Sequence, residues 1–98
     1  MYVTVTTKKR KFVYYSDPGH GWLKVPKKEL RKLHVEDRIT PYSYQKGENA
    51  YLEEDLDLGT FMQEFVAAHP DVTMEFKHRQ TDRRSRIRGY ENYKPEIT

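Results

Sequence analysis

Residues 16–22, with the sequence SDPGHGW, place a serine, an aspartate and a histidine within five residues. These residue types perform nucleophilic catalysis when each side chain orients the next beside an oxyanion hole, and they usually come from separate elements of a fold. We therefore interpret the stretch first as a glycine-rich turn that positions Trp22 in the core. The alternative is a small enzyme in which His20 works with a carboxylate, either Asp17 or Glu54.

The other histidines and carboxylates do not form a metal-binding pattern. The four histidines lack the spacing that would place two of them on one helix face, and the chain has no cysteine. The run YLEEDLDLG contains residue types that bind Mg²⁺ or transfer protons, namely Glu53, Glu54, Asp55 and Asp57. Carboxylates are equally typical of a helix start, where they meet the positive end of the helix dipole. We expect neither a metal nor a cofactor.

A run of arginines near the end of the sequence is typical of nucleic-acid binding. It contains Arg79, Arg83, Arg84, Arg86 and Arg88, and Tyr90 and Tyr93 follow it. Arginine binds phosphate through two parallel hydrogen bonds, and tyrosine rings stack on unpaired bases. The combination favours RNA or single-stranded DNA over a duplex groove, because no helix-turn-helix or zinc module accompanies it. The alternative is a basic segment that docks back on the acidic residues 53–57.

Charge is segregated along the 98 residues. Residues 1–46 hold 11 Lys and Arg against 4 Asp and Glu, and residues 77–98 hold 7 against 3. Between them, residues 47–76 hold 8 Asp and Glu and no Lys or Arg. These blocks either pair within one fold, form solvated faces, or present a local field to a partner.

Composition limits the class of protein. The length is that of one domain, and the apolar fraction of 36% implies a small core to which the 13% aromatic residues contribute strongly. No run of about 18 apolar residues exists for a membrane span, and the absence of cysteine excludes a disulfide scaffold. The first residues lack the charged-then-apolar order of a secretory signal, so we expect a cytoplasmic protein with no membrane partner.

Alternation of apolar and polar residues predicts several short strands. The pattern indicates extended segments at residues 2–6, 12–15, 22–25, 39–44, 50–53 and 72–77. Residues 8–11, which are all basic, are expected to form a turn. Asp17, Pro18 and Gly19 predict a type II turn, because proline presets the first central φ and glycine accepts the positive φ that follows.

Two helices are expected between these strands. A short helix over residues 27–33 follows Pro26, which suits the first helical position. A longer helix has its apolar face at Leu58, Phe61, Met62, Phe65 and Val66. Asp55 or Asp57 is expected to cap its start. We therefore predict an α+β domain over residues 1–78, an antiparallel sheet of four to five strands with one short and one longer helix on one face. Residues 79–98 form a basic, tyrosine-containing segment whose docking the sequence leaves open.

Three blocks of the sequence are distinctive when taken together: GHGWLKVPKKELRKL, ITPYSYQKGENAYLEEDLDLGTF and SRIRGYENY. Over residues 17–93, they resemble a family of small proteins of bacteriophages and other mobile elements. The resemblance implies an origin, and with it the cytoplasm of a bacterial host, rather than a mechanism. Small accessory proteins of phages usually act by binding nucleic acid, host enzymes or defence complexes.

We accordingly predict a non-enzymatic accessory protein that binds and modulates a host protein or a defence complex, for example as an anti-defence inhibitor. Tyrosine and arginine dominate binding hot spots. The candidate surface consists of Tyr42, Tyr44, Tyr51, Glu53, Glu54 and Asp55, with His20 and Trp22 marking a turn of interest. Nucleic-acid binding through the arginine run is the main alternative. The partner's identity and the oligomeric state do not follow from the sequence.

Overall fold

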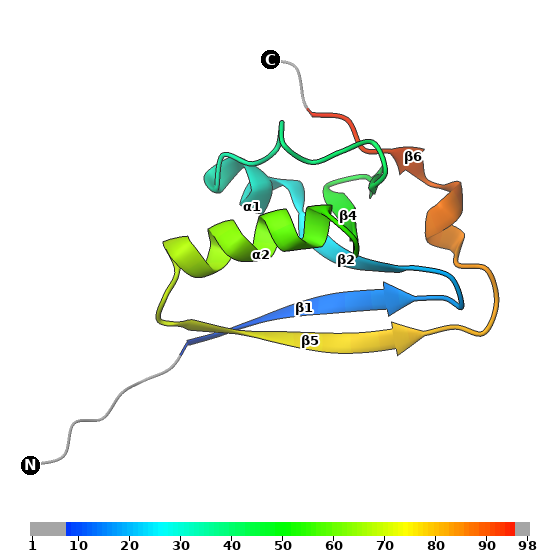
Figure 1. Ribbon diagram of the computed structural model, residues 1–98, viewed down its shortest axis with the longest axis horizontal. Coiled ribbons are helices and arrows are strands. Elements are labelled where there is room, and N and C mark those ends of the chain that lie inside the picture. Colours follow the sequence, from blue (N-terminus) through cyan, green and yellow to red (C-terminus); the bar gives the residue numbers. More distant parts are fainter. Residues whose placement is uncertain (1–7, 96–98) are drawn as a thin grey trace, which may run out of the picture.

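The computed structural model describes residues 8–95, which form one six-stranded sheet, two α-helices and a 3₁₀ turn (Figure 1). In chain order the elements are β1 (Lys8–Ser16), β2 (Gly21–Pro26), α1 (Lys27–Lys32), β3 (Tyr44–Lys46), β4 (Asn49–Glu53), α2 (Asp57–Ala68), β5 (Val72–Gln80), η1 (Arg86–Gly89) and β6 (Glu91–Asn92). The strands lie in the order β5-β1-β2-β4-β3-β6. The predicted α+β class, with one short and one longer helix, is confirmed.

The sheet differs from the predicted four to five antiparallel strands, because it has six and one pair is parallel. β3 and β6 contain three and two residues, which is too short for an alternating pattern to reveal. β5 is parallel to β1 because α2 carries the chain across the sheet after β4 (Figure 1). A helical crossover returns the chain in its original direction, and β4 itself runs parallel to β1.

β1 is longer than the sequence pattern indicated. Residues 8–11, predicted as a turn, are its first part, so that prediction was wrong. Every residue of β1 pairs with a residue of β5, and this backbone ladder overrides the local preference of a basic run. The strand predicted at residues 39–44 is mostly irregular, and only Tyr44 belongs to β3. The strand predicted at residues 2–6 lies outside the described residues.

Both helices pack on one face of the sheet, which we call the helix face. Leu30 of α1 and Phe61 and Phe65 of α2 are fully buried there. They meet sheet residues that point to the same side, namely Phe12, Leu23, Val25, Ala50 and Leu52. Val66 is 53% exposed, so it does not belong to the buried face of α2, contrary to the prediction.

The start of α2 is capped by the side chain of Glu53, whereas the sequence analysis assigned the capping role to Asp55 or Asp57. The Glu53 side chain accepts hydrogen bonds from the N–H groups of Asp55 and Asp57, each at 2.7 Å. Asp55 and Asp57, the predicted caps, do not cap the helix. The Asp57 carboxylate is fully buried and accepts hydrogen bonds from the hydroxyl groups of Thr40 (2.7 Å) and Ser43 (2.5 Å). It therefore ties α2 to the loop before β3.

The opposite face of the sheet, which we call the open face, is partly covered by the chain that follows β5. Ile87 of η1 is buried there against Trp22 and Tyr51. Tyr93 passes instead into the main core, where its hydroxyl donates a hydrogen bond of 2.6 Å to the carbonyl of Glu36. The expected boundary between residues 78 and 79 falls inside β5.

We expect Phe65→Ala to lower the free energy of unfolding by about 3–5 kcal/mol, because the fully buried ring packs on Phe12 and Phe61 and its removal leaves a cavity. Urea denaturation measures the difference. Val66→Ala is the matched control, since its half-exposed side chain is expected to change the free energy by less than about 0.5 kcal/mol. Equal effects at the two positions would contradict the orientation of α2.

Candidate nucleic-acid interface

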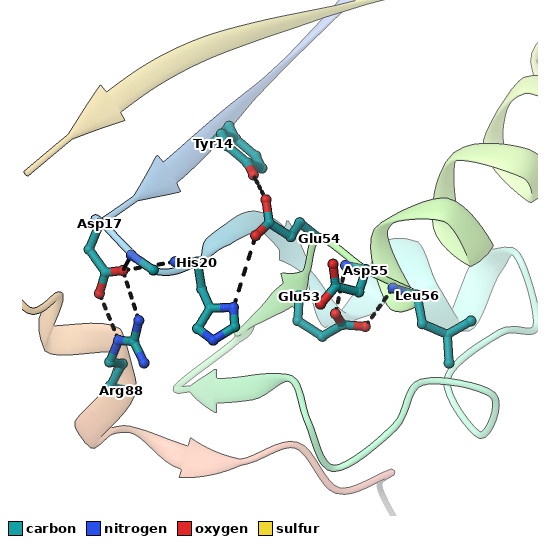
Figure 2. A network of polar contacts seen from close by, with 9 residues as sticks. Tyr14, Asp17, His20, Glu53, Glu54, Asp55, Leu56 and Arg88 are labelled. Atoms are coloured by element: carbon teal, nitrogen blue, oxygen red, sulfur yellow. Dashed lines mark hydrogen bonds and ion pairs between the residues drawn. The ribbon is translucent and has the colours of Figure 1, made fainter.

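The turn between β1 and β2 is built around the carboxylate of Asp17 (Figure 2). Its Oδ1 accepts hydrogen bonds from the N–H groups of Gly19 and His20, both at 3.0 Å. Among the described glycines only Gly47 has a positive φ, so the type II turn predicted at Gly19 was wrong. Glycine fits here for another reason, because a Cβ at Gly19 would lie 2.7 Å from Nη2 of Arg88.

Arg88 reaches this turn from the other end of the chain and forms a bidentate ion pair with Asp17 (Figure 2). The Nε–Oδ2 distance is 2.7 Å and the Nη2–Oδ1 distance is 2.9 Å. The guanidinium, assisted by the N–H of Ser85, holds the pKa of the Asp17 carboxyl well below its usual range. Arg88 also lies over the ring of Trp22, 5.4 Å from its centre. The positive charge of Arg88 is therefore paired with groups of the protein itself.

The other four predicted arginines line one open groove of about 610 Å³, which we call the arginine groove. They are Arg79, Arg83, Arg84 and Arg86, and all four are exposed. The remaining lining residues are Tyr15, Ser16, Tyr51, Gln80, Thr81, Ser85, Ile87 and Tyr90. No carboxylate is among them, so four positive charges surround one space. Of the two tyrosines assigned to nucleic-acid binding, Tyr90 lines the groove, whereas Tyr93 is buried in the main core.

Three tyrosines form the aromatic part of the groove. The Tyr51 ring lies between those of Tyr15 and Tyr90, with centroid distances of 6.2 and 5.1 Å. Burial raises the pKa of the Tyr51 hydroxyl, and the two neighbouring tyrosines raise it further, so this phenol is neutral at physiological pH. Tyr15 and Tyr90 are half-buried and keep part of each ring accessible. Lys46 stands over the Tyr90 ring, 4.9 Å from its centre.

Lysines extend the positive charge from the groove along the open face. Paired residues of neighbouring strands point to the same side of a sheet, and Val13 pairs with both Lys24 and Lys77. The same alternation turns a set of basic side chains towards the side that carries Tyr15, namely Lys9, Lys11, Lys24, Lys77 and Arg79. Glu75 points the same way and forms an ion pair of 3.3 Å with Lys9.

A second concave region, of about 430 Å³, collects most residues of the predicted protein-binding surface. We call it the aromatic–acidic pocket, and it is lined by His20, Trp22, Tyr42, Tyr44, Glu53, Asp55, Leu56 and Arg88. Tyr42 is 79% exposed and Leu56 is 56% exposed. Tyr51 lies in the arginine groove instead, although it is paired with Tyr44 in the sheet.

Glu54, the remaining residue of that predicted surface, turns towards Tyr14 and His20 (Figure 2). Its Oε2 accepts a hydrogen bond of 2.8 Å from the Tyr14 hydroxyl, and its Oε1 lies 3.9 Å from Nδ1 of His20. Burial, reinforced by the Glu54 carboxylate, raises the pKa of Tyr14 to about 12. The Asp17 carboxylate faces Arg88, so Glu54 is the carboxylate beside the His20 ring. The side chains of His20 and Glu54 are both exposed.

One contact between chemically active side chains was missed by the sequence analysis. The hydroxyl of Ser16 lies 3.0 Å from Nε2 of His78, a pair separated by 62 residues. Only the parallel pairing of β1 with β5 brings them together, so no local spacing could reveal it. A nucleophilic serine needs a base that is itself oriented by a third group, and no carboxylate of residues 8–95 contacts the His78 ring.

Geometry therefore defines this chain as a small α+β protein with a basic, tyrosine-containing groove. No family model, curated protein or solved structure matches it. Within residues 8–95, no three His, Asp or Glu side chains are grouped to hold a metal ion. No helix in the same range is both long and apolar enough to cross a membrane.

We expect Asp17→Asn to lower the free energy of unfolding at pH 7 by about 3 kcal/mol, because it removes the ion-pair partner of Arg88. The folded chain lowers the pKa of Asp17. Its stabilising contribution is thus complete above the unfolded pKa of about 4 and is lost as the pH falls below that value. Urea titrations across this range are expected to show the parent and the variant converging in acid.

The control is Asp82→Asn, at an exposed aspartate in the segment between β5 and η1. It is expected to change stability by less than about 0.5 kcal/mol at either pH. A difference between parent and Asp17→Asn that stays constant down to acid would contradict the role given to the ion pair.

Proposed function

We propose that the protein binds single-stranded nucleic acid, either RNA or DNA, in the arginine groove. The observation that carries this proposal is the lining of the groove, where four arginines and three tyrosines surround one space without a carboxylate. Each guanidinium offers a planar fork of donors that matches the oxygen atoms of a phosphate. The groove concentrates positive charge that its own lining residues do not neutralise, and a phosphate backbone supplies the matching negative charge.

A polymer fits this surface better than an isolated phosphate compound. The basic residues do not stop at the groove, because Lys77, Lys11 and Lys24 continue along the same side of the sheet. A chain of regularly spaced phosphates can contact the groove and this row of lysines together. Such distributed contacts are typical of nucleic-acid binding without strong sequence preference.

The aromatic residues favour a single strand over a duplex. Tyr15 and Tyr90 offer partly accessible rings within the groove, and unpaired bases stack on such rings whatever their sequence. Reading a duplex usually requires an exposed helix or a two-stranded ribbon that enters the major groove. Both helices of the described chain pack on the other face of the sheet.

No carboxylate of the acidic block at residues 47–76 lines the arginine groove, and several of them have other partners. The Asp57 carboxylate is buried and accepts a hydrogen bond from Ser43, and the Glu53 carboxylate caps α2. Glu64 pairs with Arg38 at 3.2 Å in the helix layer. The alternative was that the arginine run pairs with residues 53–57. Among the described residues, the ion pair that the run forms joins Arg88 to Asp17 instead.

The direct test is the salt dependence of binding to a labelled oligonucleotide of about a dozen nucleotides, prepared as RNA and as DNA. If all four groove arginines contact phosphates, the logarithm of affinity is expected to fall against the logarithm of salt with a slope of about −3. Affinity then drops about fifty-fold between about 50 and 200 mM salt. Arg84→Ala combined with Arg86→Ala is expected to halve this slope, as measured by fluorescence anisotropy.

Arg31→Ala, in α1 on the helix face, removes the same side chain away from the groove and is expected to leave the slope unchanged. Circular dichroism verifies that each variant is folded. Binding that ignores salt, or an equal loss of affinity in the Arg31→Ala protein, would overturn the proposal. The comparison of RNA with DNA then identifies the preferred sugar.

The aromatic–acidic pocket supports a second candidate function, that of a non-enzymatic modulator of a host protein or defence complex. Tyr42 and Leu56 are large apolar side chains left exposed beside the carboxylate of Asp55. Such a rim suits a partner segment that is basic and partly apolar. For either function, the site of action that we propose is the cytoplasm of a bacterial host, on the resemblance to phage proteins.

A pull-down from bacterial lysate, with and without nuclease, separates the two candidates. For the second function, we expect a protein partner that persists after nuclease and is lost with Tyr42→Ala combined with Leu56→Ala, because these exposed side chains form the contact. The Arg84→Ala and Arg86→Ala variant serves as the control and is expected to retain that partner. Capture that disappears with nuclease contradicts the second function and agrees with the first.

A further inference from the structure

Among the strands of residues 8–95, β5 is an edge strand whose outer side has no partner. All nine of its residues pair with β1 on the inner side, and no other strand of residues 8–95 pairs with it. Figure 1 shows the strand along the border of the sheet for its whole length. Proteins usually protect such an edge by keeping it short or by a proline, a bulge or charged side chains, because its backbone groups are free to pair with another chain. The charges of β5 are Glu75, Lys77 and Arg79. β5 is long and contains no proline.

The sequence of β5 is complementary to itself in the antiparallel direction. Phe76 is the midpoint of Val72–Gln80. A twofold axis through this residue aligns all nine residues of two copies and places Glu75 of each opposite Lys77 of the other. Moving the axis by one residue either way would oppose two glutamates or two lysines at the centre, which is unfavourable. Charge therefore selects the register that also gives the longest overlap.

We infer that two copies of this chain associate through β5, so that one sheet continues across both. The surface is isologous, as expected for a twofold dimer. Because residues paired across the junction point to the same side, the helix layers of both copies lie on one side and both open faces on the other. The inference does not depend on the proposed ligand, since it rests on the strand edge and not on the arginine groove.

The apolar surface beside β5 supports the same partner. Phe76 is 43% exposed on the helix face. With Tyr14, Leu58, Met62 and His78 it lines a shallow groove of about 320 Å³ between α2 and the sheet edge. A twofold axis through Phe76 places the rings of both copies opposite each other, where an aromatic cross-strand pair is favourable. The exposed ring thus gains a neighbour that the single chain does not provide.

The charged residues of β5 are also available for this contact. Lys77 is exposed and forms no ion pair with a described residue. Glu75 pairs with Lys9 at 3.3 Å, yet its side chain remains 39% exposed. In the pair of copies the Glu75 carboxylate lies between two ammonium groups, one from β1 of its own chain and one from the partner's strand.

Charge reversal gives a specific test with sedimentation equilibrium on the full chain of 11.8 kDa. The parent is expected to show a concentration-dependent dimer. Glu75→Lys alone opposes two lysines, and Lys77→Glu alone opposes two glutamates, so each variant is expected to dimerise at least about tenfold more weakly. An equal mixture of these two variants restores opposite charges at both places, and it is expected to recover the parental dimer as a heterodimer.

Complementation in the mixture requires that both variants are folded, so it distinguishes a lost contact from a lost fold. Glu48→Lys, in the turn between β3 and β4, makes the same charge change away from the edge and is expected to dimerise like the parent. A parent that stays monomeric at all concentrations would overturn the inference. So would a dimer that both single variants leave intact, or variants whose mixture behaves like either one alone.

Discussion

The carboxylate of Asp17 joins two parts of the chain that lie far apart in sequence, the turn after β1 and the segment around η1. It receives hydrogen bonds from its own turn, from the backbone of Ser85 and from the guanidinium of Arg88. A carboxylate is tolerated in the interior only when its charge and its lone pairs are satisfied, and five N–H groups achieve this here. The segment after β5 can therefore lie on the open face, and the arginine groove between that segment and the sheet depends on this ion pair for its shape.

The arginine run is divided between two tasks. Arg88 is held by a fixed carboxylate and an aromatic ring, and it organises the segment that carries the other four. Those four are exposed around a common space that no acidic side chain lines. Part of the acidic block lies at the start of α2, where Glu53 and Asp57 are hydrogen-bonded. Lysines and arginines predominate on the sheet face that the helices leave uncovered, where Glu75 is paired with Lys9.

The parts of the fold that could be predicted are those determined by near neighbours in sequence. β2 and both helices follow from short patterns, and Phe61 and Phe65 occupy the core as their spacing indicated. The parts that could not be predicted depend on distant partners. β1 extends through a basic run only because β5 lies beside it. Arg88 looked like its neighbours in the run, and its separate role appears only when Asp17, 71 residues away, is placed next to it.

The distance in sequence between these partners has a consequence for how the chain is made. β1 is synthesised before its parallel partner β5 and before Arg88, the arginine that closes its turn 71 residues after Asp17. Structures dominated by such distant contacts fold slowly, because closing a long loop costs conformational entropy before the contacts can stabilise the closed form. On the ribosome, β1 and β3 each have an edge without its partner strand until β5 and β6 have emerged. The strands of this sheet are therefore expected to fold together as one unit, once the segment that carries Arg88 and Tyr93 has left the ribosome.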